Sequence, residues 1–271
     1  MDTDIVIVGG GPAGLCMART LQGTGLQIRL VEKAESETLA EPADDGREIA
    51  LTHPSRAQLE SLGVWEGIDP DTVSELRDAW VFDGESRLPM RIEHRDGGRD
   101  QLGWLVANHR IRRAAWEAAQ SQPGLELLTG MGVESIEPVS GGRRVVLDTG
   151  ETIDASLVVA ADSRFSNLRR AAGIGARMRD FGRSMLVARI NLDHDHEHVA
   201  WEWFAYDRTL ALLPLNDRQA SCVITMPHER ARELAGLAEP EFNRQVSELY
   251  RHRLGAMTLA GERQLYPLVG V

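Results

Sequence analysis

The N-terminal stretch of the chain alternates between short apolar runs and glycine-rich breaks. Asp4 to Val8 is an apolar, β-branched run followed by glycines, and Pro12 to Gln22 carries apolar residues at helical spacing. Gly23-Thr24-Gly25 ends the helical pattern, and Leu26 to Glu32 then alternates as a second strand does. A strand, a glycine turn, a helix and a strand within about 30 residues match a βαβ crossover, which is almost always right-handed and parallel.

The rest of the chain divides into two patterns. Residues 34–45 are rich in Glu, Asp, Ser and Pro and are expected to form a loop. Up to residue 182 the pattern predicts helices at 54–62 and 110–120 and strands at 80–82, 88–92, 125–128, 133–136, 143–148 and 157–161. Beyond that, alternation predicts an antiparallel sheet from strands at 185–192, 200–206, 210–214 and 220–226, followed by an amphipathic helix at 239–253.

Composition limits the classes of partner and site. The 271 residues carry 30 Lys+Arg against 41 Asp+Glu, a formal net charge of -11, which disfavours nucleic acid as a partner. The two cysteines, Cys16 and Cys222, lie far apart and outside any metal-ligand spacing, which indicates a reduced, cytoplasmic protein. The sequence shows no apolar run of about 18 residues, so we expect any membrane contact to be peripheral, at the inner face.

A glycine fingerprint lies between the first predicted strand and helix. The segment from Gly9 to Gly14 fits G-x-G-x-x-G: Gly9 permits the turn, Gly11 leaves room for a pyrophosphate, and Gly14 allows close helix packing. Pro12 and Ala13 open the helix, whose N-terminal amides favour phosphates. Glu32, at the end of the second strand, can accept hydrogen bonds from a ribose, and Lys33 follows it. The alternative is a tight turn beside a surface glutamate.

These patterns together predict an α/β fold. We predict a Rossmann-type nucleotide-binding domain with a parallel sheet and helices, formed by residues 1–75 and 96–182. Residues 76–95 and 183–271 would form a substrate lobe built on an antiparallel sheet.

Asp162 follows the apolar run 157–161 and should therefore lie at the carboxyl end of a strand, where cofactors of doubly wound sheets bind. There it can accept a hydrogen bond from a ribitol or ribose hydroxyl. It can equally cap the helix that begins near Asn167, a role that Ser166 could share. The residues alone leave both interpretations open.

The fingerprint with Glu32, the segment Gly46-Arg47-Glu48-Ile49-Ala50-Leu51 and the Asp162 segment together resemble the class A flavoprotein monooxygenases. Among these, the chain is similar to the ubiquinone-biosynthesis hydroxylases of the UbiH, UbiI and UbiM type, along essentially its whole length. The resemblance implies that FAD is the dinucleotide. It also implies that Arg47 lies near the FAD phosphates, that Asn108 contacts the cofactor, that the backbone of Val133 lies beside the adenine, and that Asp162 is the Asp of the family's Asp-Gly segment.

The chain departs from the family pattern in two places. Ser163 stands where the resemblance leads us to expect Gly. The second flavin motif of the family, Gly-Asp-Ala-Ala-His, would be expected shortly after Tyr266-Pro267-Leu268, and we expect the chain to be C-terminally truncated. An inactive fragment that serves at most as a binding module therefore stays an alternative, as does an FAD-dependent oxidase or dehydrogenase.

The resemblance implies a hydroxylase in which NAD(P)H reduces FAD, O₂ adds at C4a of the reduced flavin, and the terminal oxygen passes to a phenolic ring. The substrate would be a small aromatic compound or a polyprenylated phenol of ubiquinone biosynthesis. Because the flavin carries this chemistry, the sequence assigns no catalytic side chain.

Two further patterns have simpler interpretations. Trp201 and Trp203 share one face of a predicted strand and could line an aromatic pocket, but ordinary sheet packing is the preferred interpretation. His194, His196 and His198 alternate with acids and invite a metal interpretation. A solvated turn explains them better, so no metal site is predicted.

Overall fold

The computed structural model describes residues 2–271 and contains three sheets. The first sheet has six strands in the order β8-β2-β1-β11-β10-β9. Four of them run parallel: β1 (Thr3–Val8), β2 (Ile28–Glu32), β8 (Leu125–Thr129) and β11 (Thr152–Ala160). The other two form an antiparallel extension: β9 (Val133–Val139) and β10 (Gly142–Leu147).

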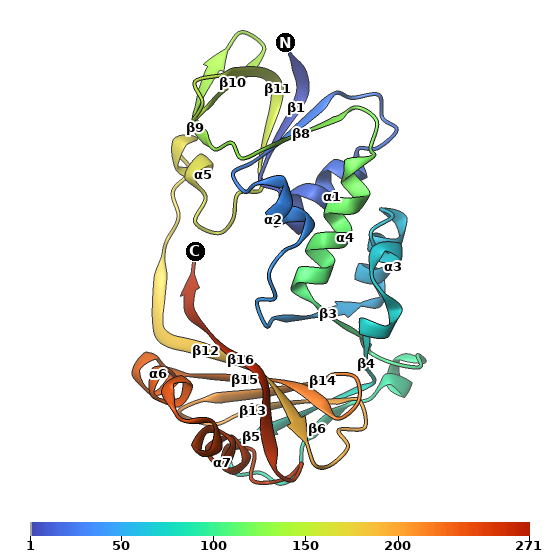
Figure 1. Cartoon of the computed structure of the whole chain (residues 1–271), viewed down its shortest axis with the longest axis vertical. Helices are drawn as coiled ribbons and strands as arrows, with labels where there is room; N and C mark the ends of the chain where they lie inside the picture. Colours follow the sequence, from blue (N-terminus) through green and yellow to red (C-terminus); the bar gives the residue numbers. More distant parts are fainter. Residues whose placement is uncertain (1) are drawn as a thin grey trace.

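Most helices of this part lie on one side of the six-stranded sheet (Figure 1). They are α1 (Pro12–Thr20), α2 (Ser36–Ala40), α3 (His53–Ser61) and α4 (Asn108–Gln120). Leu15 of α1 and Trp116 of α4 are buried with Ile7 and Leu30 of the sheet in one apolar core. The short helix α5 (Asn167–Ala171) lies on the other side. Burial of α1 and α4 fixes the glycine turn against the strand ends.

A small antiparallel sheet places two predicted cofactor residues side by side. Its order is β3-β7-β4, from Glu48–Thr52, Gly103–Ala107 and Ser74–Leu76. Glu48 pairs with Ala107, so Arg47 precedes one strand where Asn108 follows the other. Short 3₁₀ turns flank this sheet and the next, at Trp65–Gly67, Pro70–Thr72 and His94–Gly97.

The third sheet has seven strands in the order β16-β12-β15-β14-β13-β5-β6, and all its neighbouring pairs are antiparallel except β13 with β5. Helices α6 (His228–Gly236) and α7 (Glu239–Leu249) pack on one face. Trp201 and Trp203 are buried on that face with Phe242 of α7, which agrees with the packing interpretation of the tryptophans. The strands are β5 (Asp78–Asp83), β6 (Met90–Ile92), β12 (Arg179–Leu192), β13 (Val199–Phe204), β14 (Thr209–Pro214), β15 (Gln219–Pro227) and β16 (Met257–Gly270).

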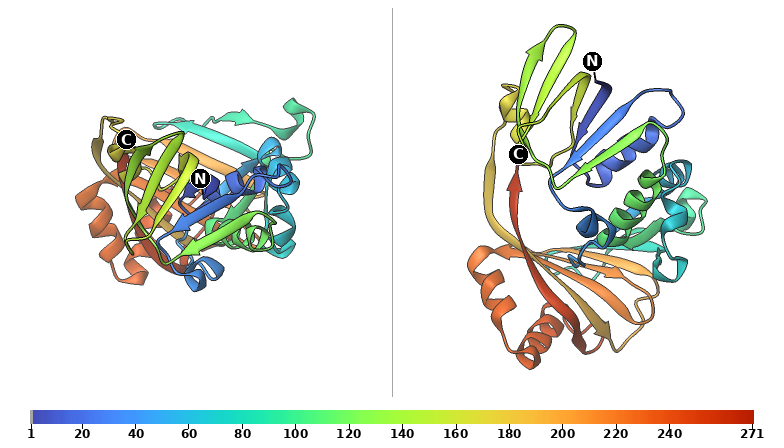
Figure 2. Two further views of the ribbon diagram at one scale, coloured as in Figure 1. Left: turned by 90° about the horizontal axis from the view of Figure 1, so that it is seen from above. Right: turned by 45° about the horizontal axis from the view of Figure 1, so that its top comes forward.

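Strand β12 carries the chain from the six-stranded sheet into the seven-stranded one, and the long strand β16 runs back beside it. β12 and β16 pair with each other and rise together toward the parallel strands, as Figure 1 and the right-hand view of Figure 2 show. The C-terminus therefore lies beside α5, far from the helices α6 and α7.

The predicted fold class is confirmed: a parallel sheet with helices is joined to an antiparallel sheet. Several element predictions were wrong. Residues 36–40 form α2 inside the expected loop, and β3, β4, β7, α6 and β16 were not predicted. The last helix ends at Leu249 rather than at residue 253, because Arg251 and His252 adopt positive φ. The division into two domains stays a prediction.

Within residues 2–271, the helices all fall short of the length and apolarity that a bilayer crossing requires.

Candidate functional site

The glycine turn between β1 and α1 is packed so closely that two of its positions exclude a side chain. Gly9 has φ +115°, and a Cβ there would lie 2.3 Å from the carbonyl oxygen of Ala161. A Cβ on Gly14 would lie 1.9 Å from the carbonyl oxygen of Gly9. Gly11 is different, because a Cβ there would meet no atom within 4 Å among the described residues. Gly9 and Gly14 are thus needed for close packing of the turn. At Gly11 the absence of a side chain leaves free space beside the backbone.

That open space lies at the N-terminus of α1. Gly11 is the N-cap residue, with φ -74° and ψ 175°, and Pro12 begins the helix with Ala13 exposed beside it. Among residues 2–271, no side chain caps this end. The first amides of a helix are unpaired donors with a partial positive charge, so this end suits a phosphate.

Glu32 turns back over the glycine turn. One of its carboxylate oxygens accepts a hydrogen bond from Gly10 N (2.5 Å), and the other accepts one from Ala34 N (2.9 Å). A carboxylate offers about four acceptor sites, so two remain for hydroxyl groups of a ligand. The backbone contacts hold Glu32 in the crevice where a ribose would lie.

A cavity of about 450 Å³ joins part of the predicted set. Gly9, Glu32, Lys33, Val133 and Asp162 all line it, although they come from four separate segments of the chain. The carboxyl ends of β1 and β2 meet here, because parallel strands end at the same edge of the sheet.

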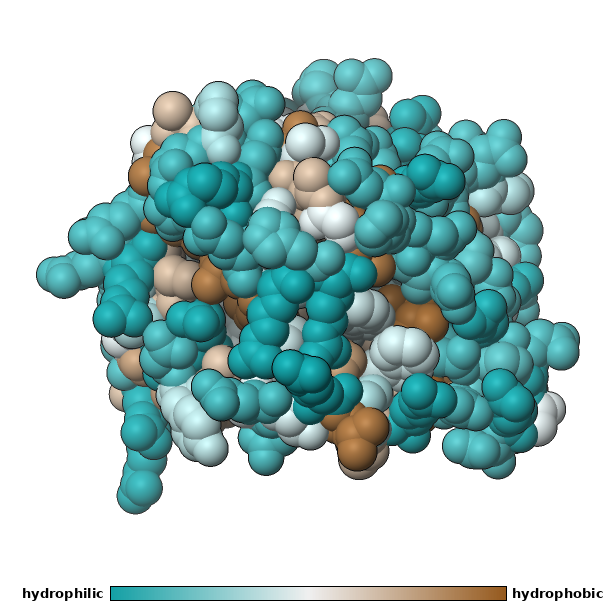
Figure 3. All heavy atoms as spheres, turned by 90° about the horizontal axis from the view of Figure 1, so that it is seen from below, coloured by the Kyte–Doolittle hydropathy of each residue, from teal (hydrophilic) through white to brown (hydrophobic). Residues whose placement is uncertain are grey.

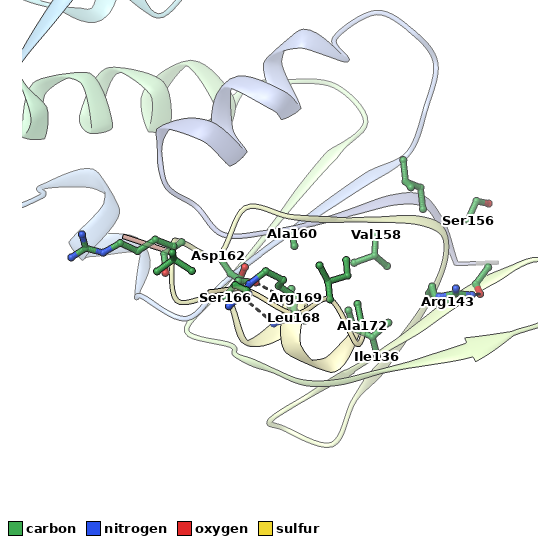
Figure 4. A pocket seen from close by; sticks show the side chains of 17 residues that line it. Ile136, Arg143, Ser156, Val158, Ala160, Asp162, Ser166, Leu168, Arg169 and Ala172 are labelled. Atoms are coloured by element: carbon green, nitrogen blue, oxygen red, sulfur yellow. Dashed lines mark hydrogen bonds between the residues drawn. The ribbon is translucent and has the colours of Figure 1, made fainter. Parts of the chain in front are cut away.

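Asp162 caps α5, which confirms one of its two predicted roles. Its other predicted role, as acceptor for a ribitol or ribose hydroxyl, stays open. One carboxylate oxygen accepts hydrogen bonds from the backbone N–H groups of Asn167 (3.1 Å) and Leu168 (3.3 Å) at the start of α5. The other oxygen is buried without a partner among the described residues. Ser166 caps the same helix by accepting from Arg169 N (2.9 Å), as Figure 4 shows. The second Asp162 oxygen is able to accept a hydrogen bond from a ligand hydroxyl or from water.

Ser163 occupies a backbone conformation that suits glycine, with φ +99°. A residue with a side chain is strained in this conformation. We expect Ser163→Gly to raise the free energy of unfolding by about 1 kcal/mol, because relief of strain exceeds the extra flexibility of the unfolded chain. Urea denaturation measures this change.

Ser156→Gly on strand β11 is the matched control for that substitution. It should instead lower the free energy of unfolding by about 0.5–1 kcal/mol, because glycine weakens a strand interior. A loss of stability in Ser163→Gly would contradict the assignment of strain.

Arg47 and Asn108 form a separate group around Asp45. The Asp45 carboxylate accepts hydrogen bonds from Arg47 Nε (3.0 Å), from Arg47 Nη2 (2.5 Å) and from Asn108 Nδ2 (2.8 Å). These contacts lower the pKa of Asp45, although its partial burial acts in the opposite direction as the largest single influence. Neither Arg47 nor Asn108 lines the cavity that holds Glu32. The structure thus gathers the predicted residues into two groups.

The histidines after β12 lie in a turn, as predicted, but the turn is not fully solvated: His194 is exposed and His196 is buried. His196 is buried and uses both ring nitrogens: Nε2 bonds to Leu215 O (2.8 Å), and Nδ1 accepts from His198 N (3.0 Å). Its imidazole is therefore committed to holding the turn.

A family model described as "FAD binding domain" matches residues 2–265, which is nearly the whole chain. The chain belongs to this FAD-binding family. The family model confirms the prediction of FAD as the cofactor, and the relatives named below confirm the predicted resemblance to ubiquinone-biosynthesis hydroxylases.

Two curated relatives match almost the entire chain. The chain is 40% identical to "Ubiquinone hydroxylase UbiM" of Neisseria meningitidis over 275 residues, covering 100% of this chain and 60% of the relative. It is 28% identical to "3-demethoxyubiquinol 3-hydroxylase" of Escherichia coli, covering 94% of this chain and 66% of that protein. The chain thus spans about three fifths of the length of the UbiM relative.

Solved structures agree on the fold. PqsL of Pseudomonas aeruginosa in complex with 2-aminobenzoylacetate superposes with a TM-score of 0.75 at 19% identity, covering 96% of this chain and 73% of that one. The p-nitrophenol 4-monooxygenase PnpA of Pseudomonas putida gives a TM-score of 0.74 at 17% identity, covering 98% of this chain and 68% of that one.

The residues present fit FAD. The helix end at Gly11 suits a pyrophosphate, the spare acceptor sites of Glu32 suit a ribose, and the unpartnered oxygen of Asp162 suits a further hydroxyl. The contact of each predicted residue with FAD stays a prediction.

Sequence reasoning missed Asp45, Tyr266 and the ion pair between Glu48 and Arg189. Tyr266 donates a hydrogen bond to the carbonyl oxygen of Asp45 (2.5 Å). Arg189 of β12 contacts the buried Glu48 of β3 at 2.7 Å, and burial raises the Glu48 pKa while the guanidinium opposes that shift. The local signal for these contacts was the Asp-Gly-Arg turn itself. Tyr266 lies 221 residues from Asp45 along the chain, and Arg189 lies 141 residues from Glu48.

Proposed function

We propose that the protein is an FAD-dependent hydroxylase that uses NAD(P)H and O₂ to oxygenate a polyprenylated phenol in ubiquinone biosynthesis. The observation that carries this proposal is the 40% identity over the whole chain to a protein named ubiquinone hydroxylase. The glycine turn and Glu32 support it, because a helix end without a side-chain cap lies next to a carboxylate that has acceptor sites to spare. As in the sequence-based prediction, peripheral contact with the inner membrane face would give access to such an apolar substrate.

In this proposal the chain supplies binding and orientation. Bound FAD would accept electrons from the nicotinamide and activate oxygen. The helix end at Gly11 would hold the pyrophosphate, Glu32 the adenosine ribose, and Arg47 with Asn108 a second part of the cofactor. Lys33, Val133 and Asp162 would complete the crevice around the adenosine half.

The test is an oxygenation assay with the full-length protein, FAD and either NADH or NADPH under ¹⁸O₂. We expect a polyprenylated phenol to accelerate NAD(P)H oxidation and to leave as a product that carries one ¹⁸O atom. Hydrogen peroxide formation at the same rate with and without phenol, and no labelled product, would favour an oxidase instead. Protein that binds no FAD in this assay would favour the binding-module alternative.

A further inference from the structure

The carboxylate of Asp45 lies where three elements of the fold meet. Asp45 belongs to the turn before β3, Asn108 begins α4, and Tyr266 belongs to β16 of the seven-stranded sheet. Asp45 bonds to Arg47 and Asn108 through its side chain and to Tyr266 through its carbonyl oxygen. It is the common partner of both residues in the second predicted cofactor group.

The turn itself is rigid around this carboxylate. The other Asp45 oxygen accepts from Arg47 N (3.1 Å), and Gly46, at φ +69°, donates its N–H to Asp44 (2.8 Å). A Cβ on Gly46 would lie 3.5 Å from Gln264 and 3.7 Å from Val187, so the turn rests on β16 and β12. The ring of Tyr266 lies 5.7 Å from the Arg47 guanidinium carbon.

The ion pair leaves Arg47 able to bind an anion. A guanidinium has five N–H donors, and Asp45 engages only the edge formed by Nε and Nη2. The side chain of Arg47 stays 45% exposed, whereas that of Asp45 is 21% exposed. A free arginine would lose rotamer freedom on binding a phosphate, and a side chain that is already held loses less.

We propose that Asp45 is a positioning residue that holds Arg47 and Asn108 ready for the phosphate-bearing part of the cofactor. This inference rests on the proposed function, because it takes Arg47 and Asn108 as cofactor residues. Asp45 would act through the arginine and the amide rather than by touching the ligand. The C-terminal strand β16 takes part, because Tyr266 fixes the turn that carries Asp45.

The test is a double-mutant cycle on FAD affinity in the full-length protein, with Asp45→Asn, Arg47→Gln and the double variant. Flavin fluorescence quenching measures the dissociation constant, and thermal unfolding of the apoprotein is followed in parallel. We expect Asp45→Asn to weaken FAD binding about tenfold, a loss of about 1.4 kcal/mol. In the Arg47→Gln background the same change should weaken FAD binding by only about two- to threefold, because the Arg47 contact is already gone and only the contact with Asn108 remains to be lost.

Controls separate positioning from general stability. Asp154→Asn removes a bidentate ion pair with Arg144 on β10 and should leave FAD affinity unchanged. Tyr266→Phe should weaken FAD binding by an intermediate amount, because the turn loses one anchor. If Asp45→Asn bound FAD more tightly, Asp45 would compete with the phosphate for Arg47. If the effects of Asp45→Asn and Arg47→Gln on FAD affinity were fully additive, the role of Asp45 would be structural only. Either result overturns the inference, whereas wild-type protein that binds no FAD would overturn the proposed function itself.

Discussion

Replacing Gly11 by Ala should abolish tight FAD binding and leave the apoprotein folded. A methyl group there meets no atom of the described chain and the backbone angles suit alanine, so the free energy of unfolding should change by less than about 1 kcal/mol. The same methyl group would occupy the space in which a pyrophosphate approaches the backbone, so we expect affinity to fall about 100-fold or more. Fluorescence titration with FAD and urea denaturation measure the two effects.

Gly14→Ala is the matched control for that prediction. Its Cβ would lie 1.9 Å from the carbonyl oxygen of Gly9, so α1 must move away from the turn. We expect a loss of about 3 kcal/mol in the free energy of unfolding together with the loss of FAD binding. If Gly11→Ala bound FAD as the wild type does, the helix end would not be the phosphate site.

Glu32→Gln should weaken FAD binding about 10- to 100-fold, because hydrogen bonds to a charged acceptor contribute about 1.5–3 kcal/mol each. The amide keeps the size of the side chain but turns one acceptor into a donor. That donor would face the N–H of Gly10 or of Ala34, both of which the carboxylate now satisfies. Isothermal titration calorimetry with FAD measures the change.

The exposed Glu37 on α2 provides a control for the effect of net charge. Glu37→Gln removes the same charge five residues farther along the chain and should leave the FAD dissociation constant unchanged within about twofold. Equal losses in the two variants would mean that Glu32 acts through long-range electrostatics and not through a ribose contact.

Local sequence patterns predicted the parts of this fold that are contiguous in the chain. Strand β1, the glycine turn, α1 and β2 follow one another directly, so short-range spacing was enough to place Gly9, Gly14 and Glu32 at one edge of the sheet. Glu32 does face the glycine turn. The coordinates agree with the roles that glycine spacing assigned, because Gly14 packs against the turn whereas Gly11 faces open space.

The features that sequence reasoning missed depend on distant segments. Strand β16 is long because it pairs with β12, some 80 residues earlier, and its own pattern is interrupted by Gly261 and by charged residues. The Asp45 contacts join the turn before β3 to Asn108 and Tyr266, which local spacing cannot bring together. Asp162 is a third case. One of its oxygens caps α5 and the other has no partner among the described residues, and an Asp at the end of a strand is equally compatible with a capping role and a ligand-binding role.

The most direct test of the cofactor site compares FAD with FMN on the full-length apoprotein and adds ADP as a competitor. The adenosine and its pyrophosphate, which FMN lacks, should supply the contacts at Gly11 and Glu32. We therefore predict that FAD binds about 100-fold more tightly than FMN, that ADP displaces FAD, and that Gly11→Ala removes the ADP effect. Equal affinities for FAD and FMN, with no competition by ADP, would contradict a dinucleotide site at this crevice.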